Sequence, residues 1–129
     1  MHHIFETSHA PLPIGPYAQA IQAGNMIFIS GQIPLSPETG ELAGTDLAAQ
    51  TRQVLKNLQA ILTAANCTIS QIVKTTVYMT DLSEFATFNR IYGAWLGSHT
   101  PARATVQVAG LPKGSLIEID AIVVKENKI

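Results

Sequence analysis

The sequence predicts an α+β fold in which a mixed β-sheet carries two helices on one face. Two segments, 46–65 and 83–96, place apolar residues at the spacing of an amphipathic helix. Short segments with alternating apolar side chains stand before, between and after these two helices. Strand–helix–strand units cross over with a right hand, which puts both helices on the same side of the sheet. The length of 129 residues suits one domain, residues 1–129.

The first third of the chain predicts an irregular start followed by a hairpin. Residues 1–16 hold three prolines and are expected to stay extended and turned. The alternating stretch 17–21 and the apolar stretch 26–33 are expected to be strands around a turn at 23–25. A glycine inside a strand marks either a bulge or the close approach of a ligand to the backbone. The pair Ser30-Gly31 therefore leaves both interpretations open.

The middle of the chain predicts helix, strand and helix after a loop over 34–44. Thr45 or Asp46 is placed to cap the first helix, and Asn66 suits the left-handed position after its end. Ser83 is expected to cap the second helix, and 72–79 forms a strand between the two. The first helix carries an apolar stripe of Leu47, Val54, Leu55, Leu58, Ile61 and Leu62. The second carries Phe85, Phe88, Tyr92, Trp95 and Leu96, which favour a core face over a binding platform.

The segment 101–122 is expected to form two strands joined by a short loop at 111–114. In a chain with only 13% charged residues, these apolar strands hold Arg103, Glu118 and Asp120. Ionised side chains are rare in apolar strands unless they form an ion pair or take part in binding or catalysis.

Arg103 and Glu118 allow two interpretations, a structural ion pair or a small anion site. A hairpin centred on the loop would set them about three residues out of register, roughly 10 Å along the strands. At that separation they would hold two ends of one small molecule. We expect both on the sheet face that the helices leave open.

Composition excludes several classes of function. The net charge of −1 and the absence of a Lys/Arg cluster argue against binding to nucleic acid or an anionic membrane. The hydrophobic fraction is 47%, and the few charged residues cannot make up the whole surface of the protein. Apolar surface is therefore expected to be hidden in an oligomer. Cys67 stands alone, which makes an intrachain disulfide impossible, and the four histidines show no metal-ligand spacing. With neither a signal peptide nor a membrane-spanning stretch in the sequence, we expect a cytoplasmic protein.

Several motifs, spread in order along the whole chain, resemble one known family. The motifs are Ile14-Gly15-Pro16-Tyr17, Ser30-Gly31-Gln32-Ile33-Pro34, Pro101-Ala102-Arg103, Leu111-Pro112-Lys113 and Ile117-Glu118-Ile119. In these motifs the chain is similar to the reactive intermediate deaminases, the YjgF/RidA family.

The resemblance implies a fold like that of the small bacterial chorismate mutase and a homotrimer with ligand sites in the clefts between subunits. It also implies hydrolysis of 2-imino acids such as 2-iminobutanoate and 2-iminopropanoate, or of their enamine tautomers, to 2-keto acids and ammonia. No cofactor is implied, and the biological role would be the control of metabolite damage.

The resemblance also assigns roles to individual residues. Arg103 would bind the substrate carboxylate, and Glu118 would hold the attacking water. The other positions are Tyr17, which would line the pocket, the backbone around Ser30, Gly31 and Thr105, which would bond the ligand, and Asn89, which would lie near the site. Many relatives have cysteine where this chain has Thr105, which argues against thiol chemistry there.

Two other functions remain as alternatives to the deaminase. One is a trimer that binds small molecules such as 2-keto acids, or a regulatory partner, without catalysis. Glu118 favours catalysis, because a pure carboxylate binder gains nothing from a like charge nearby. The other is ribonuclease activity or translation inhibition, and the lack of a basic surface argues against it.

Overall fold

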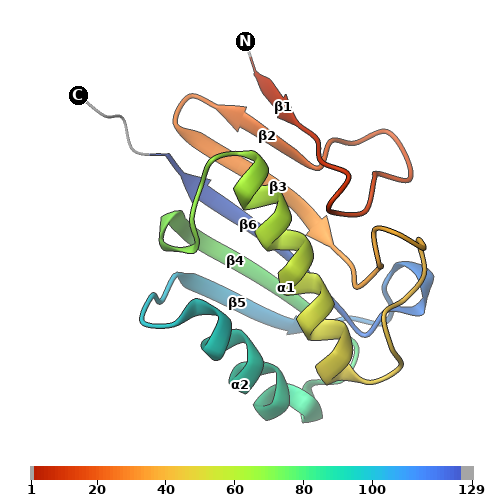
Figure 1. The fold of residues 1–129 in the computed structure, drawn as a ribbon. Coiled ribbons are helices and arrows are strands. Elements are labelled where there is room, and N and C mark those ends of the chain that lie inside the picture. The colour runs from red at the N-terminus through yellow and green to blue at the C-terminus, as the bar shows by residue number, and fades with distance from the viewer. Residues whose placement is uncertain (1, 126–129) are drawn as a thin grey trace.

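The computed structural model describes residues 2–125, which form a six-stranded mixed sheet and two α-helices. The strand order is β1-β2-β3-β6-β4-β5, in which β4 and β5 run parallel and the other neighbours antiparallel. The elements, drawn in Figure 1, are β1 (His3–Phe5), β2 (Ala20–Ala23), β3 (Met26–Gln32), α1 (Leu47–Ala64), β4 (Ile72–Met79), α2 (Phe85–Leu96), β5 (Ala102–Gln107) and β6 (Ile117–Val124).

Both helices lie on the same face of the sheet, which confirms the expected layering (Figure 1). The α1 helix packs on β3 and β6, and α2 lies beside α1 toward the β5 edge. Within residues 2–125, the opposite face of the sheet carries no helix. No helix within residues 2–125 has the length and apolar character needed to cross a bilayer.

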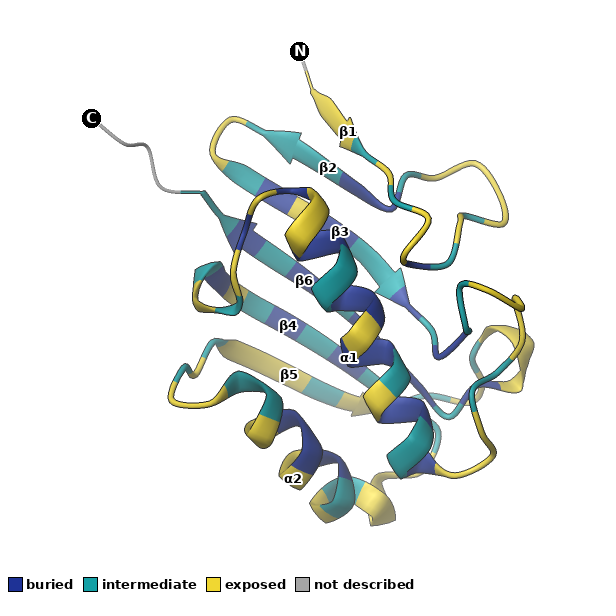
Figure 2. Ribbon diagram, in the orientation of Figure 1, coloured by how far each residue is buried: buried dark blue, intermediate teal, exposed yellow. Residues whose placement is uncertain are grey.

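The core lies between the sheet and α1, and β6 shows how it forms. Buried and half-buried residues alternate along β6, so that Ile117 and Ile119 are fully buried beneath the helices (Figure 2). Leu58 and Ile61 on the apolar stripe of α1 are buried against this face. Each such side chain contributes about 1.5–3 kcal/mol when it leaves water. Strand and helix periodicity therefore place this core as expected.

The ends of α1 also follow the sequence. The Asp46 side chain accepts a hydrogen bond from the backbone N–H of Ala49 at 2.7 Å. This bond satisfies one of the donors that the first turn of a helix leaves free. Past the other end, Asn66 has a φ of 57°, which is the left-handed conformation expected there.

The expected cap of α2 was wrong. The N-cap residue of α2 is Glu84, and its side chain makes no capping hydrogen bond. The Asp81 carboxylate caps a short 3-10 turn, Leu82–Glu84, where it accepts a hydrogen bond from the Ser83 N–H at 2.9 Å, and this turn leads directly into Phe85. Acids and serines both cap helices, so composition alone could not show that a turn capped by Asp81 comes before α2.

Two expectations for the first 33 residues needed correction, and one was confirmed. The segment expected to be irregular contains the short strand β1, which pairs with β2. Tyr17 lies before β2 instead of beginning a strand. The register of β3 against β6 shifts between Ile29 and Gln32, which confirms the irregularity expected at Ser30-Gly31.

The expected hairpin of β5 and β6 was also wrong. The two strands are not neighbours, because β4 lies between them, parallel to β5 and antiparallel to β6. Burial explains this order. Every second residue of β6 is buried, whereas β5 is exposed along most of its length. The strand that buries more apolar surface takes the central place, and β5 occupies the edge (Figure 2).

Candidate active site

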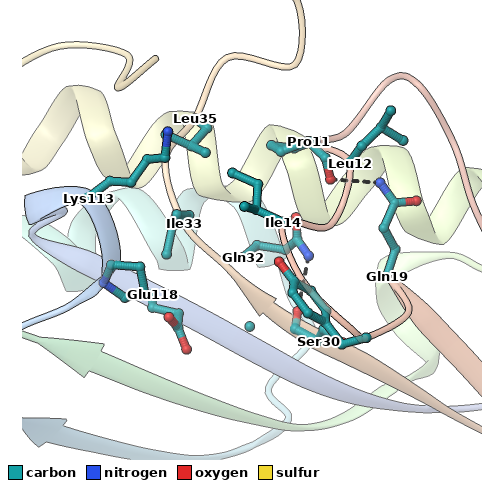
Figure 3. Close-up of a pocket in the computed structure, with 13 residues that line it drawn as sticks. Pro11, Leu12, Ile14, Gln19, Ser30, Gln32, Ile33, Leu35, Lys113 and Glu118 are labelled. Carbon is teal, nitrogen blue, oxygen red and sulfur yellow. Dashed lines mark hydrogen bonds between the residues drawn. The ribbon is translucent and has the colours of Figure 1, made fainter. Parts of the chain in front are cut away.

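A cleft of about 500 Å³ opens beside the irregular part of β3. We call it the Glu118 cleft, and Figure 3 draws the residues that line it. Its walls come from the loop before β2, from β3 with the loop that follows, and from the turn before β6. The lining residues are Pro11, Leu12, Ile14, Tyr17, Gln19, Ser30, Gly31, Gln32, Ile33, Leu35, Pro112, Lys113 and Glu118.

Glu118 is the acid of the cleft, and its position depends on Gly31. Glu118 lies on β6 among the half-buried residues that face away from the helices. A Cβ added to Gly31 would come within 2.7 Å of the Glu118 Cδ and 3.1 Å of its Cγ. Such contacts are closer than van der Waals distance. The glycine thus leaves the space that the carboxylate occupies, which is the close approach that a glycine within a strand can indicate.

The surroundings of Glu118 favour its protonated form. Burial raises the pKa of its carboxyl above the usual value, and the negative charge of Asp120 raises it further. Asp120 lies two residues along β6 on the same face and accepts a hydrogen bond from the Tyr78 hydroxyl at 3.2 Å. A carboxyl with a raised pKa exchanges protons more readily near neutral pH, as a general acid or base requires.

The loop before β2 forms one wall of the cleft and is held by Gln19. The Gln19 Nε2 donates to the backbone oxygen of Pro11, a bond that Figure 3 shows, and to the backbone oxygens of Thr7 and Ala10. The Gln19 Oε1 accepts from the Thr7 N–H at 2.7 Å. Tyr17, at the end of this loop, is 52% exposed and borders the cleft. The sequence did not single out Gln19, because its burial and its bonds to the loop exist only in the folded chain.

Ser30 lines the same cleft, but its hydroxyl already has a partner. The Ser30 Oγ donates to the backbone oxygen of Ala18, and its N–H donates to the oxygen of Gln19 at 2.9 Å. These bonds join the loop to β3. Ser30 therefore shapes the cleft wall more directly than it offers a free hydroxyl.

Lys113 is a cation at the rim of the cleft that the sequence did not assign to the site. It has a φ of 59°, a left-handed conformation that is uncommon for residues other than glycine. Figure 3 shows its side chain reaching toward Leu35, away from the Glu118 carboxylate. Its place between a proline and a glycine, just before the strand that bears Glu118, was the available signal.

Arg103 lies on the face of the sheet that the helices cover, so the expected shared face was wrong. Arg103 on β5 is paired with Thr75 on β4, and Thr75 is paired with the buried Ala121 on β6. Neighbours across a sheet point to the same side. Its guanidinium donates to the Asn89 Oδ1 at 2.8 Å and lies over the aromatic face of α2.

Thr105 shares this face and lies two residues further along β5. Its hydroxyl oxygen is buried and has no hydrogen-bond partner within residues 2–125. Arg103 also borders a second hollow of about 310 Å³, lined with Tyr92, Leu96, Thr100 and Pro101.

The predicted site residues therefore form two groups. Tyr17, Ser30, Gly31 and Glu118 meet in the Glu118 cleft, while Arg103, Asn89 and Thr105 lie on the other face of the sheet. Arg103 is paired with Thr75 and Glu118 with Tyr78, which keeps the expected offset of three residues. Two strand spacings add roughly 10 Å across the sheet, and the side chains point to opposite sides. One small molecule cannot touch both within a single subunit.

The described residues 2–125 hold no cluster of three or more His, Cys, Asp or Glu side chains placed to bind a metal ion. The groups that the Glu118 cleft offers for chemistry are a carboxyl with a raised pKa, the Tyr17 hydroxyl, the Lys113 ammonium at the rim and the backbone.

Comparisons with known proteins identify the family. The family profile described as Endoribonuclease L-PSP matches residues 7–125. The chain belongs to the YjgF/RidA family. A RutC family protein of Pyrococcus horikoshii is 51% identical over 126 residues, covering 98% of this chain and 100% of the relative. The 2-iminobutanoate/2-iminopropanoate deaminase of Escherichia coli strain K12 is 52% identical over 122 residues, covering 92% of this chain and 94% of the relative.

A solved structure of the YjgF/RidA family has the same fold. The crystal structure of E. coli TdcF with bound serine matches with a TM-score of 0.92 and 46% identity, covering 96% of this chain and 99% of the other. These findings confirm the family that the sequence motifs indicated and the α+β architecture.

Proposed function

We propose that this protein is a cytoplasmic hydrolytic deaminase, acting as a single domain over residues 1–129. Its substrates would be 2-imino acids with short side chains, 2-iminobutanoate and 2-iminopropanoate, together with their enamine tautomers. The observation that carries this proposal is the Glu118 carboxylate, held against Gly31 in a cleft and given a raised pKa by burial. A relative that is 52% identical and named for this activity supports the choice of substrate.

The proposed reaction needs only a carboxylate, a water molecule and an anchor for the substrate. The substrate enters as the N-protonated iminium, with its carboxylate on Arg103. The water oxygen bonds to C2, the C=N electron pair moves onto nitrogen, and Glu118 takes the proton that the water releases. Glu118 then returns this proton to nitrogen. The C–N bond breaks with its electron pair on nitrogen, and the departing ammonia takes the hydroxyl proton as the 2-keto acid forms.

A site between subunits is part of this proposal. Arg103 and Glu118 lie on opposite faces of one sheet, so an anchor and a base for one small molecule must come from two copies of the chain. The helix-free face exposes Phe28 (44%) and Val106 (41%), which is apolar area that a second copy would cover. We infer a homotrimer, in keeping with the family resemblance, with Arg103 of one subunit facing the Glu118 cleft of the next.

The activity is tested by generating the imine with an amino-acid oxidase and following its capture by semicarbazide. The protein should lower the rate of semicarbazone formation and raise the rate of 2-keto acid release. Glu118→Gln should still bind 2-oxobutanoate but hydrolyse the imine about 10²–10⁴-fold more slowly. Binding of 2-oxobutanoate without imine hydrolysis by the wild-type protein would instead support a binding protein without catalysis.

The shared site is tested by mixing two inactive variants. Arg103→Met and Glu118→Gln subunits, refolded together in equal amounts, should regain activity, because some interfaces pair an intact Arg103 with an intact Glu118. Random assembly makes about a quarter of the interfaces complete. A mixture with no more activity than either variant alone would place the two residues in separate functions.

A further inference from the structure

We propose that the aromatic face of α2, together with Asn89, is a positioning platform for the Arg103 guanidinium. The platform consists of Phe85, Phe88, Asn89 and Tyr92. This inference rests on the proposed role of Arg103 as an anion anchor. It assigns a second task to residues whose spacing alone indicates a helix core.

The guanidinium lies close to three rings at once. The Arg103 Cζ is 5.3 Å from the centroid of Phe85, 5.6 Å from that of Phe88 and 5.3 Å from that of Tyr92. All three fall within the distance of about 6 Å over which a ring attracts a cation. The residues at 85, 88, 89 and 92 recur at helical spacing, so one face of α2 presents every contact.

The platform is itself rigid. Phe88 and Tyr92 are buried, and their rings stack with centroids 5.0 Å apart. The Tyr92 hydroxyl shares a hydrogen bond of 2.6 Å with Thr75, the neighbour of Arg103 across the sheet. Fixed rings can hold a guanidinium in one orientation at little entropic cost.

The platform is also electrically neutral, which separates it from a structural ion pair. Within residues 2–125 no carboxylate lies within ion-pair distance of Arg103. Its hydrogen-bond acceptor is the neutral amide of Asn89, and its other neighbours are ring faces. A carboxylate partner would cancel the charge that binds an anion. A neutral platform orients the guanidinium and leaves its full charge, and most of its five N–H donors, for a ligand carboxylate.

The test compares two substitutions of Phe85, at the edge of the platform, with a control substitution outside the platform. Phe85 is the half-buried member of the three aromatics, so its replacement disturbs the core least. Phe85→Leu should weaken binding of 2-oxobutanoate about three- to tenfold. Phe85→Tyr keeps the ring and should bind as the wild type does. Trp95→Leu removes a partly buried aromatic from the same helix that does not contact Arg103, and should also bind normally.

Asn89 supplies a sharper comparison. Asn89→Asp places a carboxylate where the amide accepts from Arg103, and this built-in anion should weaken 2-oxobutanoate binding more than Asn89→Ala does. Both variants should raise the KM for the imine and leave kcat within about twofold, since the platform acts on ground state and transition state alike. Equal effects of Asp and Ala at this position would contradict a neutral platform.

One measurement does not depend on activity. In protein labelled with ¹⁵N-arginine, the ring currents of the platform should shift the Arg103 side-chain resonances, and Phe85→Leu should move them toward ordinary arginine values. If Phe85→Leu loses this shift but binds 2-oxobutanoate as the wild type does, the platform proposal is overturned and the deaminase proposal stays intact. Failure of Arg103→Met to weaken 2-oxobutanoate binding would overturn the anchor role itself. If Phe85→Leu and Trp95→Leu weaken 2-oxobutanoate binding equally, the aromatic face of α2 serves only as part of the hydrophobic core.

Discussion

The Glu118 carboxylate lies where a side chain on Gly31 would have to be. A Cβ built on Gly31 comes within 2.7 Å of the Glu118 Cδ, although the two residues belong to different strands. The register shift of β3 beside Gly31 and the half-buried position of Glu118 on β6 create this contact. The glycine thereby determines where the proposed general base can point.

We therefore expect Gly31→Ala to inactivate the protein through Glu118. The added methyl group should push the carboxylate out of place and lower kcat/KM for imine hydrolysis about 10²-fold or more. Gly93→Ala is the matched control, because nothing lies within 4 Å of a Cβ at that position. The control should keep full activity. An active, folded Gly31→Ala variant would mean that the position of Glu118 does not limit the reaction.

Arg103→Lys should lose most activity although the positive charge remains. Lysine lacks the planar fork that fits a carboxylate and cannot keep the Asn89 contact in the same geometry. A charged hydrogen bond contributes about 1.5–3 kcal/mol, so kcat/KM should fall roughly 10- to 100-fold. Steady-state kinetics on the imine, with the melting temperature as a control for folding, check this. Near-native rates would show that charge alone is sufficient.

The local pattern of the sequence was enough to predict most elements of the fold. Alternation in β6, the helical spacing in α1 and the glycine at 31 all depend on neighbours within a few residues. The sheet order does not. Whether β5 pairs with β6 or with β4 depends on how much apolar surface each strand can bury in the finished fold. In the structure, β4 lies between β5 and β6 and pairs with both.

The candidate site was predicted only in part, because its geometry also depends on how the elements pack and not only on the local sequence pattern. Alternation showed that Arg103 and Thr105 share a face, but not that this face lies beneath α2. The partners of Arg103 are Phe85, Phe88 and Tyr92. Their spacing along the sequence is the same as that of aromatic residues in an ordinary helix core. Gly31 and Glu118 were recognised individually, whereas their contact required the three-dimensional register of β3 against β6.

The protein should be a trimer in solution at micromolar concentration. The helix-free face of the sheet exposes large apolar side chains in a chain that is only 13% charged, and burial of that area favours association. Light scattering coupled to size exclusion measures the mass directly. A monomer would contradict the proposed site between subunits, and Val106→Glu, which puts a charge on this face, should weaken the assembly.

Cys67 should be dispensable for activity. Its side chain is buried, its Sγ contacts the backbone oxygen of Ala65 at 3.5 Å, and burial raises the pKa of the thiol. A buried thiol with a raised pKa is a poor nucleophile. Cys67→Ser should retain imine hydrolysis and lose about 1–2 kcal/mol of stability from burying a hydroxyl. Inactivation of a still-folded Cys67→Ser protein would assign the thiol a role.

Glu118 makes the stability of the protein depend on pH in a direction that can be worked out. Burial and the charge of Asp120 raise the folded-state pKa of Glu118 above its usual value of 4.5. Between these two pKa values the folded state binds more protons than the unfolded state. Stability contributed by this group is therefore complete below pH 4.5 and falls as the pH rises through the folded pKa.

Glu118→Gln should remove this loss, because an amide stays neutral at every pH. We expect the variant to be more stable than the wild type at pH 7 and equally stable below about pH 4.5, a difference that denaturant unfolding at fixed protein concentration measures across the range. The gain in stability would accompany the loss of imine hydrolysis, as expected for a group kept at a site for its chemistry. A variant less stable than the wild type at pH 7 would instead mean that a charged partner from a neighbouring subunit stabilises the Glu118 carboxylate.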